Sequence, residues 1–216
     1  MEIELGDQIL SENNSEAKKV REKLKKLNLF AINIMASPGA GKTSLIIQLL
    51  KALPKELKAG VIEGDVASSV DTDKIKALGW PAFQINTSGG CHLTAAMVDR
   101  AIDNLGISGP GIIFIENIGN LICPTEFDLG ENLRLVLSSV PEGDDKPIKY
   151  PGIYQKADAI VLNKIDFLPH SDFDYDYFLK GLRLTNPAAP VFKLSSKTGE
   201  GISKLAAYLT DPPLPA

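Results

Sequence analysis

Short apolar runs alternate with stretches of helical periodicity along the chain. The apolar runs predict strands at residues 29–35, 58–63, 82–86, 111–116, 133–140, 157–163 and 191–194. Apolar residues three or four apart predict helices at residues 44–53, 71–78, 93–105, 173–184 and 202–209. Since parallel strands need helical crossovers, this alternation predicts an α/β fold with a doubly wound, mainly parallel sheet and helices on both faces.

A further helix is expected before the first strand. Residues 1–28 indicate a polar lead-in followed by a helix, with Ser15 as its N-cap and Val20, Leu24 and Leu27 as its apolar stripe. The other face of this helix is rich in lysine, which is typical of a solvated surface. A core-facing helix is therefore expected to precede the sheet.

A phosphate-binding loop is predicted between the first strand and the next helix. The segment Ala36-Ser-Pro-Gly-Ala-Gly-Lys-Thr43 matches this motif except that Ala36 stands where a glycine is usual. Gly39 and Gly41 permit positive φ angles and close backbone approach, so the N–H groups of residues 39–44 can surround phosphate oxygens at a helix N-terminus. The residues expected to bind phosphate are Gly39, Ala40, Gly41, Lys42, Thr43 and Ser44.

A guanine site is predicted by Asn163-Lys-Ile-Asp166, which follows a buried strand. An Asp166 carboxylate can accept both the N1–H and the 2-amino group of guanine, and adenine offers neither donor there. Lys164 would pack along the ring, and Ser195-Ser-Lys197 fits the companion loop that contacts the guanine carbonyl. The chain then divides into a helical lead-in over 1–28, a P-loop GTPase domain over 29–211 and a proline-rich tail over 212–216.

Hydrolysis of GTP depends mainly on charge neutralisation and Mg²⁺. Lys42 is expected to reach the terminal phosphates, and the Thr43 hydroxyl is expected to bind Mg²⁺. Glu116, at the end of a buried strand, is the principal carboxylate candidate, and Asp65 is the second. The alternative for Asp65 is to cap the next helix. No glutamine stands where it would orient the attacking water, so slow hydrolysis is expected.

Composition favours a cytoplasmic protein without nucleic-acid or membrane partners. The chain has 216 residues, a hydrophobic share of 44%, a charged share of 23% and a net charge of −4. Nucleic-acid-binding domains usually carry a basic face, which this balance does not suggest. No apolar run is long enough for a bilayer, and the acidic N-terminus lacks the layout of a signal peptide.

Three residues form a candidate site for a transition metal. Cys91 and His92 are expected to begin a helix, and Cys123 lies seven residues beyond Glu116. Both segments should leave the carboxyl ends of strands, the edge where the nucleotide is expected. Two thiolates and an imidazole suit Zn²⁺ or Ni²⁺ and would leave the coordination shell open. Buried cysteines with a polar histidine are an equally reasonable interpretation of the spacing alone.

Longer motifs resemble one known family. These are Gln84-Ile-Asn-Thr87, Cys91-His-Leu93, Glu116-Asn-Ile-Gly-Asn-Leu-Ile-Cys-Pro124, Phe127-Asp-Leu-Gly-Glu131 and Glu142-Gly-Asp-Asp-Lys-Pro-Ile-Lys-Tyr-Pro151. Together they closely resemble the hydrogenase nickel-incorporation GTPases, with urease accessory GTPases as more distant relatives.

The resemblance implies a metallochaperone that couples GTP binding and hydrolysis to nickel delivery into the large subunit of [NiFe]-hydrogenase. It implies a metal site at Cys91, His92 and Cys123, located at the interface of a GTP-promoted homodimer. It also implies a second maturation metallochaperone as partner. A lysine of the charged loop, Lys146 or Lys149, is expected by similarity to reach the phosphates of the other subunit, although a solvated surface loop would look the same.

Residues 1–29 contain no cysteine or histidine, in contrast to family members that bind nickel near the N-terminus. A separate carrier is therefore expected to supply the nickel. Two other functions stay open: a urease-type nickel insertion GTPase, and a zinc-binding scaffold whose nucleotide is rarely turned over.

Overall fold

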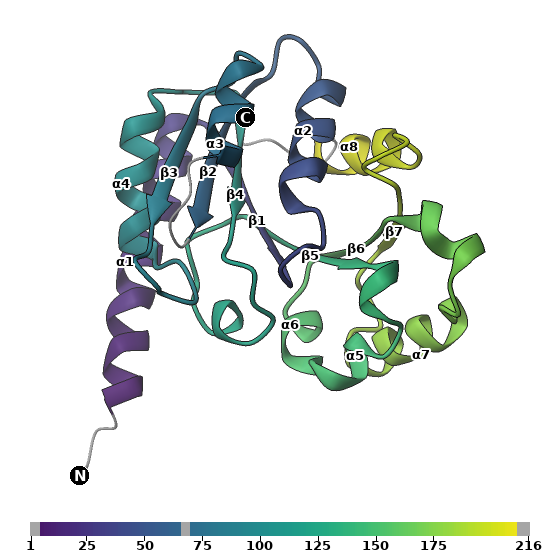
Figure 1. The fold of residues 1–216 in the computed structure, drawn as a ribbon. Helices are drawn as coiled ribbons and strands as arrows, with labels where there is room; N and C mark the ends of the chain where they lie inside the picture. Colours follow the sequence, from purple (N-terminus) through teal and green to yellow (C-terminus); the bar gives the residue numbers. More distant parts are fainter. Residues whose placement is uncertain (1–4, 66–69, 211–216) are drawn as a thin grey trace.

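Seven parallel strands form one sheet in the order β3-β2-β4-β1-β5-β6-β7. The computed structural model describes residues 5–65 and 70–210, with side chains from residue 8 onward (Figure 1). The strands are β1 (Leu29–Ala36), β2 (Lys58–Asp65), β3 (Ala82–Asn86), β4 (Gly111–Glu116), β5 (Leu133–Ser139), β6 (Ala159–Asn163) and β7 (Val191–Lys193). Each predicted strand is present within two residues of its expected ends.

Helices cover both faces of the sheet, as expected (Figure 1). They are α1 (Leu5–Leu27), α2 (Lys42–Ala52), α3 (Val70–Ala77), α4 (Ala95–Leu105), α5 (Lys146–Lys149), α6 (Pro151–Gln155), α7 (Tyr175–Thr185) and α8 (Ile202–Thr210). Apolar residues of α2 and α8 share one core with the sheet, and those of α1 and α4 share the core on the opposite face. A third cluster lies beneath α6 and α7.

Helix α1 is longer than its sequence pattern predicts. It begins at or before Leu5, so Ser15 lies inside the helix and is not its N-cap. Val20 and Leu24 are buried as expected, whereas Leu27 is half-buried. Any polar lead-in would fall in residues 1–4, outside the described residues.

The part of α1 that precedes the predicted start contains a buried polar residue, Asn13, which contacts two other segments. Its side-chain oxygen accepts a hydrogen bond from Ala95 N at 2.9 Å, and its amide nitrogen donates to Asp128 O at 2.7 Å. Asn13 therefore caps the start of α4 from a different helix, while Thr94, the residue at the N-cap of α4, makes no side-chain capping bond. These two hydrogen bonds tie α1 to the segments that follow the candidate metal residues Cys91, His92 and Cys123 in the chain.

Two further predictions of local structure were wrong. Cys91 and His92 do not begin a helix, because α4 starts at Ala95 and both residues lie in the preceding loop. The expected charged loop around residues 142–151 instead contains the 3₁₀ turn η2 (Val140–Glu142) followed by α5 and α6. Both short helices carry a proline in their first turn, where the missing N–H costs nothing.

Candidate functional site: a nucleotide pocket beside a cysteine–histidine loop

The phosphate loop joins β1 to α2 with two residues in the left-handed region. Gly39 has φ 77° and Gly41 has φ 99°, a conformation that favours glycine. Ala40 is fully buried beneath the loop, and the fully buried Ala36 ends β1 at the position of the missing first glycine. The loop therefore has the backbone shape that its sequence predicts.

The functional side chains of this loop point to two neighbouring cavities. Lys42 is 8% exposed and lines a cavity of about 270 Å³, while Ser44 lines the adjacent cavity of about 370 Å³. Burial lowers the pKa of the Lys42 ammonium, against the raising influence of Glu116 and other nearby carboxylates. A buried cation at a helix N-terminus is suited to receive the terminal phosphates of a nucleotide.

A cluster of carboxylates stands opposite Lys42. Thr43 Oγ1 donates to Glu116 Oε1 at 3.0 Å and lies 3.3 Å from Asp71 Oδ2. Asp65 ends β2 and lines the same cavity, as does Glu63. Asp71 and Glu63 are not among the residues that the sequence predicts for this site, because Asp71 begins a predicted helix and Glu63 ends a predicted strand. Thr72 donates a hydrogen bond to the buried Glu63 carboxylate.

The position of Glu116 fits a divalent cation. Its Oε2 is buried without a hydrogen-bond partner, and burial raises the pKa of Glu116 to about 7 even though Lys42 opposes the shift. An orphaned carboxylate oxygen beside a threonine hydroxyl matches the oxygen ligands that Mg²⁺ prefers, since Mg²⁺ usually keeps several waters and takes few protein ligands. Among the described residues no three His, Cys, Asp or Glu side chains converge as a complete metal site.

The predicted base site is assembled around the second cavity. Asn163 Nδ2 donates to Ala40 O at 3.0 Å, and Asn163 Oδ1 accepts from Ser196 N at 3.0 Å. Asp166 Oδ1 accepts from Ser195 Oγ at 2.6 Å, which orients the carboxylate. The cavity is lined by Gly41, Ser44, Asn163, Lys164, Asp166, Phe167, Ser196 and Lys197. All the residues expected at the base thus meet at one place, directly beside the phosphate loop.

Lys164 links the base site to the phosphate loop. Its Nζ donates to Gly39 O at 2.6 Å, and its backbone is left-handed with φ 59°. An αL conformation is uncommon for a residue with a long side chain. Lys164 thus lines the base cavity while its ammonium group contacts the phosphate loop.

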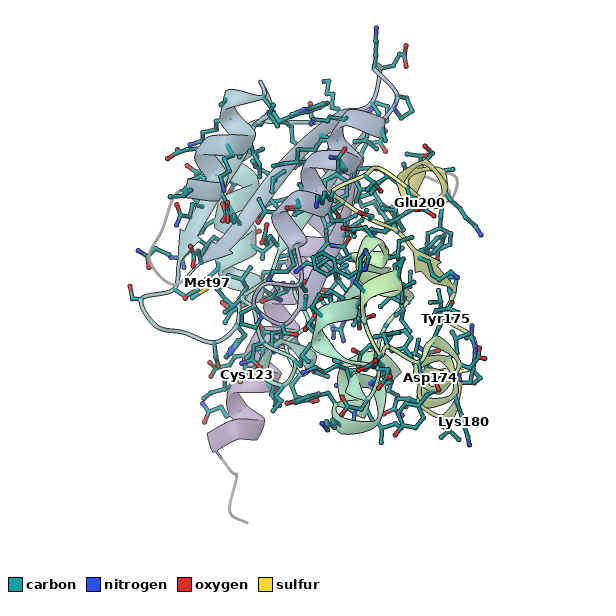
Figure 2. The ribbon with its side chains drawn as sticks, turned by 45° about the vertical axis from the view of Figure 1, so that its right-hand side comes forward. Met97, Cys123, Asp174, Tyr175, Lys180 and Glu200 are labelled. Atoms are coloured by element: carbon teal, nitrogen blue, oxygen red, sulfur yellow. The ribbon has the colours of Figure 1, made fainter. Side chains whose placement is uncertain are left out.

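The three candidate transition-metal residues come from two adjacent loops. Cys91 Sγ lies 3.4 Å from His92 Nδ1, and the neighbouring Cys123 thiol raises the pKa of Cys91 through a hydrogen bond. The His92 ring stacks on Phe127 with centroids 3.7 Å apart, and burial lowers the pKa of its imidazole. Figure 2 shows Cys123 well away from Asp174, Tyr175 and Lys180, which belong to α7 or directly precede it. Among the described residues no three His, Cys, Asp or Glu side chains lie close enough together to hold a metal ion, so the role of Cys91, His92 and Cys123 as metal ligands stays a prediction.

The two candidate lysines of α5 differ in their surroundings. Lys146 lies over the Tyr150 ring, 5.3 Å from its centroid, and lines a cavity of about 250 Å³ that also includes Ser37 and Pro38 of the phosphate loop. Lys149 instead pairs with Asp145 at the surface. Of the two, Lys146 is the one whose side chain borders the phosphate loop.

Comparison with known proteins identifies the family. The family model "CobW/HypB/UreG, nucleotide-binding domain" matches residues 30–193. The chain belongs to this family. Within it, the chain is 43% identical over 208 residues to the hydrogenase maturation factor HypB of Azotobacter chroococcum mcd 1, covering 96% of this chain and 68% of the relative. It is 36% identical over 214 residues to the hydrogenase/urease maturation factor HypB of Helicobacter pylori strain J99, covering 97% of this chain and 88% of that protein.

A solved HypB structure has the same fold. The crystal structure of HypB from Helicobacter pylori in complex with nickel superimposes with a TM-score of 0.87 at 35% identity, covering 93% of this chain and 94% of that chain. This HypB-family chain is therefore a P-loop GTPase of the hydrogenase maturation factors. No helix in the described part of the chain is long and apolar enough to cross a bilayer.

Proposed function

We propose that this HypB-family GTPase is a nickel metallochaperone for [NiFe]-hydrogenase maturation, in which GTP and Mg²⁺ close a homodimer and hydrolysis opens it. The observation that carries the proposal is the position of the cysteine–histidine loop. It follows β3, which β2 separates from β4, and its last backbone N–H, that of Leu93, donates to Asn117, the residue directly after Glu116 of β4. A change at the bound phosphates can therefore reach the loop that carries Cys91 and His92 and the segment after β4 that carries Cys123.

Nickel is the cargo in this proposal. Cys91, His92 and Cys123 bind it from one subunit, and their open arrangement is completed by the same residues of a second copy. Ni²⁺ and Zn²⁺ both suit thiolate and imidazole ligands. A thiolate is the binding form, so metal uptake releases the protons that the raised pKa of Cys91 retains.

Each part of the nucleotide pocket has a proposed role. Asn163, Lys164, Asp166 and the Ser195–Lys197 loop bind guanine, and residues 39–44 bind the phosphates. Thr43 and Glu116 hold Mg²⁺, with Asp65 and Asp71 placed to act through its waters. Bound Mg²⁺ would neutralise phosphate charge, and Lys42 would hold the terminal phosphates in line for attack by water.

The partners of the proposed cycle are a second maturation metallochaperone that supplies nickel and the hydrogenase large subunit that receives it. A urease-type role is a second candidate, because one relative at 36% identity is named a hydrogenase/urease maturation factor. The two functions use the same cargo and differ in the acceptor, so transfer of nickel to purified apo-hydrogenase large subunit or to apo-urease distinguishes them.

Sedimentation velocity tests the dimer switch. The protein is compared with GDP and with a non-hydrolysable GTP analogue, each with Mg²⁺ and with or without Ni²⁺. A dimer that forms with the analogue and takes up nickel through Cys91 and Cys123 supports the proposal. A mass and a nickel content that do not depend on the nucleotide favour a zinc-binding scaffold with little turnover.

A further inference from the structure

The loop that carries Cys91 and His92 is attached at both ends to the strands of the phosphate pocket. At its start, Thr87 N donates to Asp65 O at 3.1 Å. At its end, Leu93 N donates to Asn117 Oδ1 at 3.4 Å. Asp65 ends β2 and Asn117 directly follows Glu116 of β4. Cys91 and His92 are therefore held between the two strand ends that carry the candidate Mg²⁺ carboxylates.

The side chain of Leu93 reinforces the second attachment. Leu93 is fully buried against Gly64, where an added Cβ would lie 2.9 Å from Leu93 Cδ2. Gly64 stands between Glu63 and Asp65 in β2, and all three residues line the phosphate cavity. Leu93 thus contacts β2 through its side chain and Asn117 through its backbone. Because His92 directly precedes Leu93, a displacement of either strand end moves the imidazole.

Asn117 is itself held tightly. It is 1% exposed, its Nδ2 donates to Asn33 Oδ1 at 3.2 Å, and its Oδ1 also accepts from Ile118 N at 2.9 Å. The bond to Leu93 N is the longest of these, and it is the one that leads to the loop carrying Cys91 and His92. A buried amide with several partners has few alternative positions, so its contacts hold it in one place relative to the backbone of β4.

The same buried network returns to His92 from its other side. Asn33 Nδ2 donates to Glu131 Oε1 at 3.3 Å, and Glu131 Oε2 accepts from Leu129 N at 2.7 Å. Leu129 lies two residues after Phe127, whose ring stacks on His92. The imidazole is therefore positioned from one side by Leu93 and from the other by Phe127.

We infer that Asn117 and Leu93 are positioning residues that couple the Mg²⁺–phosphate pocket to the Cys91–His92 pair. When a bound Mg²⁺ engages Glu116, Asn117 shifts with it, and the Leu93 backbone carries that shift to His92. The inference rests on the proposed function, since it specifies how the nucleotide state regulates the proposed nickel site. It adds that the coupling acts within one subunit and does not require the second copy.

Histidine NMR tests this coupling without any nickel. The chain has two histidines, His92 and His170, so the imidazole signals of a ¹³C-labelled sample can be assigned from the variant His170→Gln. His170 lies in η3 (Ile165–His170) with the proposed guanine residue Asp166 and is remote in sequence from the network. Addition of Mg²⁺ and a GTP analogue, compared with GDP, is expected to shift the His92 signal in the wild-type protein and to leave it unshifted in Asn117→Ala.

Three further variants make the NMR test specific. Phe127→Leu removes the ring stacking, so the chemical shift of His92 should already differ from wild type with GDP bound. It should still change when the GTP analogue and Mg²⁺ replace GDP. Asn132→Ala removes a hydrogen bond to Ala31 N outside the network and should behave as wild type. Gly64→Ala displaces Leu93 by contact alone and should reduce the response even if Asn117→Ala fails to fold. A full His92 response in both Asn117→Ala and Gly64→Ala overturns the inference.

Nickel titrations separate this inference from the proposed function. The ratio of nickel affinities with GTP analogue and with GDP measures the coupling, which for allosteric proteins is typically about 5–150-fold. The ratio is expected to fall to about one in Asn117→Ala. Nickel binding that does not involve Cys91 or His92 contradicts the proposed function. The positioning role of Asn117 and Leu93 is then still decided by the NMR experiment, which contains no nickel. A wild-type ratio retained in Asn117→Ala overturns the positioning role alone.

Discussion

The hydroxyl of Thr43 donates a hydrogen bond to Glu116 Oε1 at 3.0 Å, while the second oxygen of Glu116 is buried without a partner. Thr43 lies at the start of α2 and Glu116 at the end of β4, so this contact joins the helix after the phosphate loop to the sheet. A carboxylate with only one of its two oxygens hydrogen-bonded can bind a cation through the other oxygen. Glu116 directly precedes Asn117, whose side-chain oxygen accepts a hydrogen bond from Leu93 N at the end of the cysteine–histidine loop.

The burial of Glu116 predicts a pH dependence of stability. Its pKa is about 7, against an ordinary value of 4.5, so between these values the folded protein keeps a proton that the unfolded chain has lost. The free energy of unfolding of the nucleotide-free protein should therefore fall as the pH rises through this range. Glu116→Gln does not titrate, so urea unfolding at several pH values should show a smaller fall in this variant.

Glu63 and Glu142 leave a residual pH dependence in Glu116→Gln, because burial raises the pKa of both carboxyl groups as well. Excess Mg²⁺ and GDP should also reduce the wild-type dependence, since a cation at Glu116 replaces the proton. Equal pH dependence of the free energy of unfolding in the wild type and Glu116→Gln would show that Glu116 is not the titrating group.

Asp166→Asn is expected to change the base that the protein binds. The amide cannot accept both donors of guanine, but it can donate to the 2-carbonyl of xanthine. Hydrogen bonds to charged groups contribute about 1.5–3 kcal/mol each, so GDP affinity should fall by about 100-fold or more while XDP binds better than to the wild type. Competition titrations with a fluorescent nucleotide measure both. Unchanged GDP affinity would place the base elsewhere.

Lys146→Ala should lower GTP turnover far more than Lys149→Ala. Lys146 borders the phosphate loop of its own subunit, whereas Lys149 pairs with Asp145. A cation at the phosphates, supplied from the same subunit or across a dimer, can contribute about 10³-fold to the rate. Mixing Lys146→Ala with Lys42→Ala should restore part of the activity, because one site of the mixed dimer has both lysines. Absence of any recovery in a mixture shown to form mixed dimers would exclude action in trans.

Asn13→Ala should destabilise the protein by about 2–4 kcal/mol, since it leaves the Ala95 N–H and the Asp128 carbonyl without their partner. Asn14→Ala is the matched control: it is the neighbouring residue, it is exposed, and it should change stability by less than about 0.5 kcal/mol. Urea unfolding of the two variants measures the difference. Similar losses in both would mean that the capping of α4 by Asn13 contributes nothing to stability.

The sequence was sufficient for the strands and the nucleotide pocket because both are encoded locally. A buried parallel strand is a continuous apolar run, and the phosphate and guanine motifs are short segments at strand ends. The start of α1 was missed because Asn13 occupies a core-facing position where the pattern requires an apolar residue, four residues before the fully buried Ala17.

Other features depend on contacts between distant segments. Asp71 joins the pocket because α3 brings it to Thr43, and no local signal distinguishes it from the other acidic residues of that turn. Helices α5 and α6 span four and five residues, too few for a periodic pattern to show. The attachment of Leu93 to Asn117 is a contact between loops after two different strands.

The most direct test of the account is the nickel dissociation constant of the wild-type protein, measured with GDP and with a non-hydrolysable GTP analogue in the presence of Mg²⁺. The account predicts different constants in the two states, with the difference lost in Cys91→Ala and Cys123→Ala, and a matching effect of nickel on analogue affinity. Equal nickel affinity in both nucleotide states would contradict the proposal that this GTPase couples its nucleotide to nickel.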